Sequence, residues 1–203
     1  MILPTNDPSL TSKGFPIDSL PKNIGGLLPI AASWDELTSV KRAAAVLLLM
    51  IPPLQNTADS RIVLIRRSAQ VRSHRGQIGF PGGRREPSDK GPCETALRET
   101  QEELGVAPDR IRVLGMLPKA KSLDGMPVVP IVGIATVTSD SLTPEPSEVE
   151  DFYAIEWPHF SPEKYHVFNM NIFGIWRQSG VFLTQGLSVW GLTAHVLCTA
   201  SLG

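Results

Sequence analysis

Cysteine is scarce in this sequence, and a long apolar run is absent. The two cysteines among 203 residues, Cys93 and Cys198, lie far apart and lack metal-ligand spacing, which indicates reduced thiols in a cytoplasmic compartment. The longest apolar run, AAAVLLLMI at 43–51, is too short to cross a bilayer and predicts a buried strand. The first residues lack the pattern of a secretory signal. We therefore expect a cytoplasmic protein with no membrane partner.

An excess of one charge is also absent. Nineteen basic side chains balance twenty acidic ones, for a net charge of −1, so the chain lacks the basic surface that duplex nucleic acid requires. The sequence also contains no phosphate-binding P-loop, no zinc-binding His-Glu-x-x-His pair and no Gly-x-Ser-x-Gly elbow. Any recognition of phosphate must come from a local group of side chains.

The order of apolar and turn-forming segments predicts an α/β protein. Residues 1–32 are rich in Pro, Gly and Ser and predict an irregular arm, followed by a single domain at 33–203. Segment 68–92 is expected to be mostly loop. Helices are expected at 33–42, 93–104 and within SVWGLTAHVL at 188–197, and strands at 43–51, 61–67, 111–117, 128–137, 152–157 and 172–177. This order favours an α/β/α sandwich with a mixed β-sheet.

The expected helix at 93–104 carries an unusual number of acids. Pro92 and Gly105 mark its ends, and the glutamates stand at positions 94, 99, 102 and 103. Like charges three or four residues apart destabilise a helix by roughly 0.2–0.5 kcal/mol per pair. A solvated helix face is the alternative interpretation, but Arg98 is the only base nearby to offset the repulsion. The pattern therefore favours a bound cation.

The acids are expected to converge on one spot. Glu99 and Glu103 stack one helical turn apart with Glu102 beside them, and the turn Pro81-Gly82-Gly83 allows the backbone to approach closely. Carboxylate oxygens, a backbone carbonyl at Gly83 and water make a site for Mg²⁺ or Mn²⁺. A divalent ion there would cancel the repulsion.

These residues resemble the Nudix hydrolase superfamily. Its box is a Gly, five residues, a Glu, seven residues, then Arg-Glu-U-x-Glu-Glu-x-Gly-U with U apolar, and this chain has RETQEELGV at 98–106. Thr100 stands at the first U position. Five residues separate Gly83 from Asp89, and eight residues, one more than in the box, separate Asp89 from Arg98. Counted back from Arg98, the expected acid falls on Lys90, and Asp89 lies one place earlier.

The longer spacing is similar to that of the coenzyme A diphosphatase subgroup. A second motif of that subgroup, LIRRSAQVRSHRGQIGFPGG at 64–83, stands directly before the box. Further matches are SLDGMPVVPIVG at 122–133, SEVEDFYAIEW at 147–157 and VWGLTAHVL at 189–197. The resemblance covers about residues 43–197 and implies the Nudix fold and hydrolysis of the pyrophosphate of coenzyme A, or of an acyl derivative, to a 3′-phosphorylated adenine nucleotide and 4′-phosphopantetheine.

The resemblance also implies roles for individual residues. Glu99 and Glu103 are the expected ligands of Mg²⁺ or Mn²⁺, and Glu102 is a further ligand or orients the attacking water. Arg98 is expected to pair with a glutamate and fix its rotamer. Glu148 is either an additional late acid or a solvated loop acid.

Contacts to the substrate's phosphates are expected from the second motif. The residues concerned are Arg66, Arg67, Arg72, His74 and Gln77. Because side chains alternate along a strand, Arg66 and Arg67 cannot both point inward. His74 is either a donor or a packed loop histidine, and Gln77 anchors either the loop or the substrate.

Two other functions remain open. A diphosphatase for ADP-ribose or a nucleotide sugar would share the metal site, and a non-catalytic Nudix module would bind a nucleotide without cleaving it. Retention of Glu99, Glu102 and Glu103 favours catalysis. A small nucleotide is the expected partner, with a homodimer as one assembly that the sequence leaves open, as it does the preference for free or acylated coenzyme A.

Overall fold

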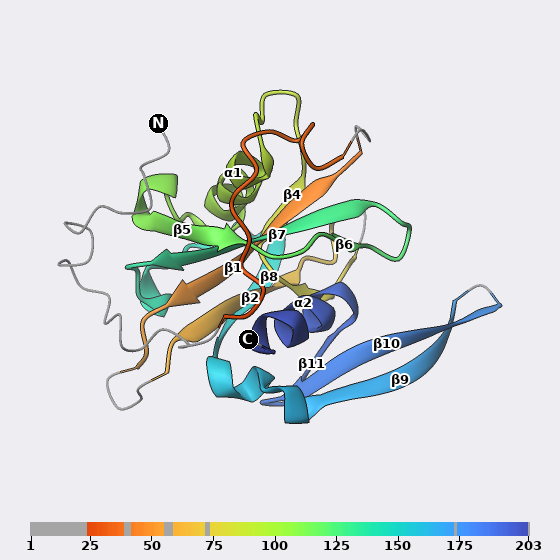
Figure 1. The fold of residues 1–203 in the computed structure, drawn as a ribbon. Coiled ribbons are helices and arrows are strands. Elements are labelled where there is room, and N and C mark those ends of the chain that lie inside the picture. Colours follow the sequence, from red (N-terminus) through yellow and green to blue (C-terminus); the bar gives the residue numbers. More distant parts are fainter. Residues whose placement is uncertain (1–23, 39–41, 55–58, 72–73, 173, 203) are drawn as a thin grey trace.

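The computed structural model describes residues 24–38, 42–54, 59–71, 74–172 and 174–202. Within them, the helices α1 and α2 lie on opposite sides of a mixed β-sheet (Figure 1). The helices are α1 (Pro92–Leu104) and α2 (Gly191–Ser201). The strands are β1 (Ala44–Ile51), β2 (Arg61–Arg67), β3 (Ile78–Gly79), β4 (Gly82–Arg84), β5 (Ile111–Met116), β6 (Ala120–Lys121), β7 (Pro127–Ala135), β8 (Val149–Glu156), β9 (Tyr165–Ile172), β10 (Ile175–Thr184) and β11 (Leu187–Trp190).

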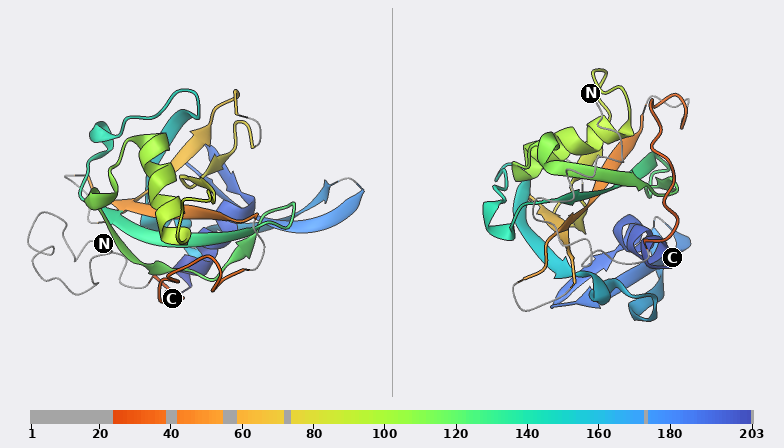
Figure 2. Two further views of the ribbon diagram at one scale, coloured as in Figure 1. Left: turned by 90° about the horizontal axis from the view of Figure 1, so that it is seen from above. Right: turned by 60° about the vertical axis from the view of Figure 1, so that its left-hand side comes forward.

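The central sheet is built around β1 and β7, which run parallel to each other. The order β3-β2-β1-β7-β5 forms its main path, with β4 paired to β1, β6 to β7 and β8 to β2, all antiparallel. A second, antiparallel sheet has the order β11-β10-β9. Its β9–β10 hairpin projects beyond the body of the molecule (Figure 2).

The apolar run of β1 supplies both cores because its side chains alternate between the two faces of the sheet. Leu47 and Leu49 pack in the cluster beneath α1. Leu48 and Met50 pack in the cluster that includes α2 and the second sheet. This arrangement confirms the predicted α/β/α sandwich with a mixed sheet.

The predicted helix at 33–42 is not formed in its described part, residues 33–38, which make turns. Glu36 accepts hydrogen bonds from the Ala32 N–H and the Ser33 hydroxyl, as a capping pair would, but the segment closes only one turn. Trp34 is buried, and its Nε1 donates to the Thr95 hydroxyl on α1 at 3.3 Å. Packing of the Trp34 side chain therefore holds residues 33–38 against α1.

Other boundaries also differ from the prediction. The strand expected at 172–177 is wrong, because the β9–β10 turn falls there, at Gly174 with φ +83°. The expected loop at 68–92 contains the short strands β3 and β4. The helix expected within 188–197 begins only at Gly191, after the strand β11.

The described end of the expected N-terminal arm contacts the body of the molecule. Leu28 forms an antiparallel bridge with Met116, and the Gly25 N–H donates to the Ala200 carbonyl. Residues 1–23 lie outside the described residues, so the extent of the arm stays a prediction. In the described segments, no helix is both long and apolar enough to traverse a bilayer.

Candidate metal and nucleotide site

Glu103 is the most deeply buried acid of α1. Its side chain is 0% exposed. Oε2 accepts a hydrogen bond from the Gly82 N–H at 2.8 Å, while Oε1 lies 3.2 Å from Arg67 Nη2 and receives no hydrogen bond. Burial raises the pKa of Glu103 to about 8, although Arg67 and the Gly82 N–H favour its ionised form. The oxygen Oε1 is therefore a buried acceptor that lacks a donor.

Glu99 lies one helical turn before Glu103 and faces the glycine-rich turn. A Cβ atom on Gly83 would come within 2.4 Å of the Glu99 carboxyl group. Only glycine therefore leaves room for this carboxylate against β4. Burial raises the pKa of Glu99, and Arg98 opposes the shift. The negative charge of Glu99 further raises the pKa of Glu103, and that of Glu102 raises the pKa of Glu99.

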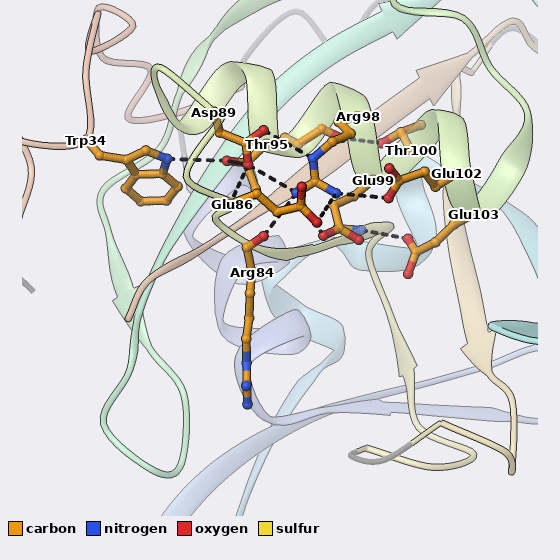
Figure 3. Close-up of polar contacts among 12 residues, drawn as sticks. Trp34, Arg84, Glu86, Asp89, Thr95, Arg98, Glu99, Thr100, Glu102 and Glu103 are labelled. Carbon is orange, nitrogen blue, oxygen red and sulfur yellow. Dashed lines mark hydrogen bonds and ion pairs between the residues drawn. The ribbon is translucent and has the colours of Figure 1, made fainter. Parts of the chain in front are cut away.

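Arg98 is surrounded by acids (Figure 3). Its Nη1 donates to Glu102 at 2.9 Å, and its Nη2 lies 3.1 Å from Glu99 Oε1. Nε and Nη2 donate to Asp89, and Nη2 also donates to the Arg84 carbonyl at 3.0 Å. The hydrogen bonds that Arg98 donates to Asp89 raise the pKa of Arg98 above its already high ordinary value. The expected pairing of Arg98 with a glutamate is therefore present.

The three box glutamates do not converge as predicted. Arg98, four residues earlier on the helix, draws the Glu102 carboxylate toward solvent, where it is 49% exposed. Within the described ranges, no three His, Cys, Asp or Glu side chains are grouped closely enough to form a ready metal site. Glu99 and Glu103 are the two acids that share the buried position.

Asp89 is a site residue whose role the sequence did not reveal. Its carboxylate is buried and accepts hydrogen bonds from Arg98, from the Thr95 hydroxyl at 2.8 Å and from the Glu86 N–H at 2.8 Å. Burial opposes its ionisation, but these donors outweigh burial and lower its pKa. The sequence feature that could have identified Asp89 is its place one residue before the expected acid of the box. Asp89 accepts hydrogen bonds from Arg98, and Arg98 in turn pairs with Glu99 and Glu102.

A cavity of about 960 Å³ opens beside Glu99. Arg67, His74, Gln77 and Gly83 line it, as does Glu148 from the loop before β8. Site residues that are far apart in the sequence therefore line one cavity. The sequence did not identify further lining residues, which come from β4, β6 and the C-terminal part of the chain: Arg84, Lys121, Trp190, Leu192 and His195.

At the end of β2, two arginines of the second motif point in opposite directions. Arg67 points to the α1 side, where its Nη2 donates to the Gly82 carbonyl at 2.5 Å. Arg66 points the other way, as the alternation predicted, and its Nε donates to the Tyr153 hydroxyl at 2.8 Å. Arg66 is not among the residues that line the cavity, which corrects its expected substrate contact. Arg72 lies outside the described residues.

His74 stands at the rim of the cavity in a left-handed conformation, with φ +59°. Its Nδ1 lies 2.9 Å from Gln77 Oε1, so the two side chains orient each other. A non-glycine residue in this conformation is strained and is enriched at ligand-binding loops. The side chain is exposed rather than packed, which favours a role as donor over a role in packing.

The donor set fits a hard divalent cation. Glu99 and Glu103 stand one turn apart, and Glu103 Oε1 receives no hydrogen bond even though Arg67 Nη2 lies 3.2 Å away. Gly83 brings backbone against the Glu99 carboxylate, and the Gly82 N–H contacts that of Glu103. Oxygen ligands of this kind suit Mg²⁺ and Mn²⁺. Such an ion would also replace the proton that burial otherwise favours on Glu103.

Comparison with known proteins identifies the family. Residues 41–172 match the model of the NUDIX domain. The chain is 35% identical over 160 residues to the uncharacterized Nudix hydrolase NudL of Pectobacterium atrosepticum, which covers 77% of this chain and 80% of that protein. It is 36% identical over 162 residues to the protein of the same name from Photorhabdus laumondii, covering 79% and 84%.

Among solved structures, the chain is similar to the Nudix hydrolase RenU of M. smegmatis, with 19% identity, a TM-score of 0.48 and coverage of 59% of this chain and 73% of that one. The domain match spans more than half of the sequence, and both named relatives exceed 30% identity over more than three quarters of it. This chain belongs to the Nudix hydrolase family.

Proposed function

We propose that the chain hydrolyses the pyrophosphate bond of coenzyme A or its acyl derivatives. Water adds to one phosphorus, the bridging oxygen leaves with the other phosphate, and the products are adenosine 3′,5′-bisphosphate and 4′-phosphopantetheine or its acyl form. One observation carries the proposal: residues of the second motif, Arg67, His74 and Gln77, line the same cavity as the box acid Glu99.

The catalytic end of the cavity is assigned to α1. Glu99 and Glu103 would hold Mg²⁺ or Mn²⁺ together with the Gly83 carbonyl, and Glu102 or Glu148 would complete the set or orient water. A divalent cation bound there polarises phosphate oxygens and lowers the pKa of bound water. Arg98, held by Asp89, keeps the carboxylates of Glu99 and Glu102 in place.

The substrate's phosphates need fixed donors. Arg67, His74 and Gln77 are the proposed contacts, and Arg72 stays a proposed contact from the sequence. Arg84 and Lys121 also line the cavity and add positive charge. Two free cysteines, Cys93 and Cys198, agree with the proposed cytoplasmic location.

A substrate panel tests the proposal. Coenzyme A, acetyl-coenzyme A, ADP-ribose and a nucleotide sugar are each incubated with Mg²⁺ or Mn²⁺, and the products are identified by mass. We expect cleavage of a coenzyme A species to adenosine 3′,5′-bisphosphate. A higher kcat/KM for ADP-ribose or the nucleotide sugar would overturn the coenzyme A assignment, and binding without turnover of any substrate would indicate a non-catalytic module.

The 3′-phosphate provides a sharper form of the same test. A hydrogen bond to a charged group contributes roughly 1.5–3 kcal/mol, so coenzyme A should exceed its 3′-dephospho form in kcat/KM by roughly ten- to a hundredfold. Arg67→Ala should reduce that ratio, whereas Arg66→Ala is the matched control, because the neighbouring arginine contacts Tyr153 instead. An equal kcat/KM for the two substrates in the wild type would contradict the proposal.

A further inference from the structure

The lining of the cavity separates into a charged part and an uncharged part. All of its Lys, Arg, Asp and Glu side chains come from residues before 149, and they are Arg67, Arg84, Glu99, Lys121, Asp124 and Glu148. From Tyr165 onward, the lining residues of the described chain include none of these four types. We call this second part the C-terminal wall; it is contributed by β9, β10, β11 and the first turn of α2.

The C-terminal wall is held in place by close backbone contacts. Gly180 on β10 lies directly under the Tyr165 ring, since a Cβ atom there would come within 1.9 Å of the phenol oxygen. On the other side, a Cβ on Gly79 would lie 3.3 Å from the Thr193 hydroxyl, so β3 and α2 meet across a gap that suits only a small residue. The wall is therefore continuous with β3, which follows the loop of the second motif.

The side chains of the C-terminal wall suit an uncharged ligand. Val167, Trp190 and Leu192 present apolar surface, and Val167 is 54% exposed. Gln178, on the same face of the β9–β10 hairpin as Val167, adds a neutral amide that can pair with amide groups. His195 and Tyr165 add an imidazole and a phenol.

Coenzyme A has the same division. One side of its pyrophosphate carries the 3′-phosphorylated adenosine, and the other carries the pantetheine arm, which has two amides, a hydroxyl and a thiol but no formal charge at neutral pH. We propose that the C-terminal wall is the subsite for the pantetheine arm, while the charged part holds the phosphorylated nucleoside. This assignment rests on the proposed function and adds to it which wall recognises which half of the substrate.

The two reaction products separate the halves and allow a binding test that needs no turnover. In the full chain with Mg²⁺, the affinities for 4′-phosphopantetheine and adenosine 3′,5′-bisphosphate are measured by titration calorimetry. Leu192→Glu should weaken the binding of 4′-phosphopantetheine by about tenfold, which corresponds to about 1.4 kcal/mol, and should change the affinity for adenosine 3′,5′-bisphosphate less than twofold. Leu192→Met, which keeps an apolar side chain, should bind 4′-phosphopantetheine with an affinity close to that of the wild type.

Val167 and Phe168 supply a matched pair that is independent of any folding defect at Leu192. They are consecutive on β9, so their side chains point to opposite faces, and only Val167 lines the cavity. Val167→Glu should selectively lower the affinity for 4′-phosphopantetheine, and Phe168→Glu should lower the affinity for neither product. A non-specific effect of the added negative charge would act more strongly on adenosine 3′,5′-bisphosphate, which carries the larger charge.

The outcomes separate the subsite from the proposed function. Equal weakening of the binding of both products would overturn the subsite, and selective weakening of adenosine 3′,5′-bisphosphate would put the adenosine half on the C-terminal wall, while cleavage of coenzyme A would still stand. If the wild type binds neither product and does not cleave coenzyme A, the proposed function fails and the subsite fails with it.

Discussion

Glu102 and Glu103 are neighbours in the sequence, but α1 turns them toward different surroundings. Glu102 is half exposed and paired with Arg98 at 2.9 Å. Glu103 is fully buried, and its Oε1 receives no hydrogen bond. Arg98 neutralises the exposed side of the helix. On the buried side, Arg67 lies 3.2 Å from Glu103 Oε1 but donates no hydrogen bond to it, which leaves this oxygen open to a cation. Glu102 therefore belongs to the ion-pair network around Arg98, whereas Glu103 has an oxygen that is free to bind a ligand.

The largest expected effect concerns catalysis at the buried side. Glu103→Gln keeps the shape of the side chain but removes the charge, so we expect kcat to fall by about a hundredfold or more, at 1.36 kcal/mol per factor of ten. Glu94→Gln is the matched control, because Glu94 lies in the first turn of the same helix, where it accepts from the Lys90 N–H. Most of the wild-type turnover in purified Glu103→Gln would show that the site is wrongly assigned.

The next effect concerns the paired side. Asp89→Asn removes a buried charge that holds Arg98, and we expect a loss of about 1–3 kcal/mol in the free energy of unfolding, measured with urea. The affinity for Mg²⁺ should fall less than in Glu103→Gln, because Asp89 acts on Glu99 and Glu102 only through Arg98. If Asp89→Asn left both stability and activity unchanged, Arg98 would not depend on this carboxylate.

The two sides should also respond to pH in opposite directions. Glu103 has a pKa of about 8 when folded and 4.5 ordinarily, so between these values only the folded state keeps the proton, and stability in chelator falls as pH rises. Asp89, with its lowered pKa, contributes stability above its ordinary pKa of 3.8 and loses it as pH falls. Urea unfolding between pH 5 and 8 should slope downward for the wild type and less so for Glu103→Gln. Equal slopes in both proteins would rule out Glu103 as the source.

The smallest effect is expected at Glu102. An exposed ion pair four residues apart on a helix contributes roughly 0.3–0.5 kcal/mol, so Glu102→Gln should change the free energy of unfolding by no more than this. The measurement is thermal unfolding in chelator. A loss of several times this size would mean that Glu102 is held as firmly as Asp89.

The sequence predicted the features that depend on local pattern. The acidic helix at 93–104, the strands at 43–51 and 61–67, and the opposite directions of Arg66 and Arg67 all follow from periodicity and the flanking Pro92 and Gly105. Features set by contacts distant in sequence were missed. The burial of Glu103 depends on Gly82 and Arg67, and the C-terminal wall of the cavity depends on a hairpin whose turn was mistaken for a strand.

The binding of a divalent cation by Glu99 and Glu103 is tested most directly by the melting temperature with and without saturating Mg²⁺. A ligand that binds only the native state raises the melting temperature. We predict a clear gain for the wild type and for Glu94→Gln, and little or no gain for Glu99→Gln and Glu103→Gln. In chelator, both of these variants should be as stable as the wild type or slightly more stable, because a neutral amide at either position carries no charge that burial and the neighbouring acids disfavour. Equal gains in all four proteins would contradict the account and leave these acids as an ordinary charged face of α1.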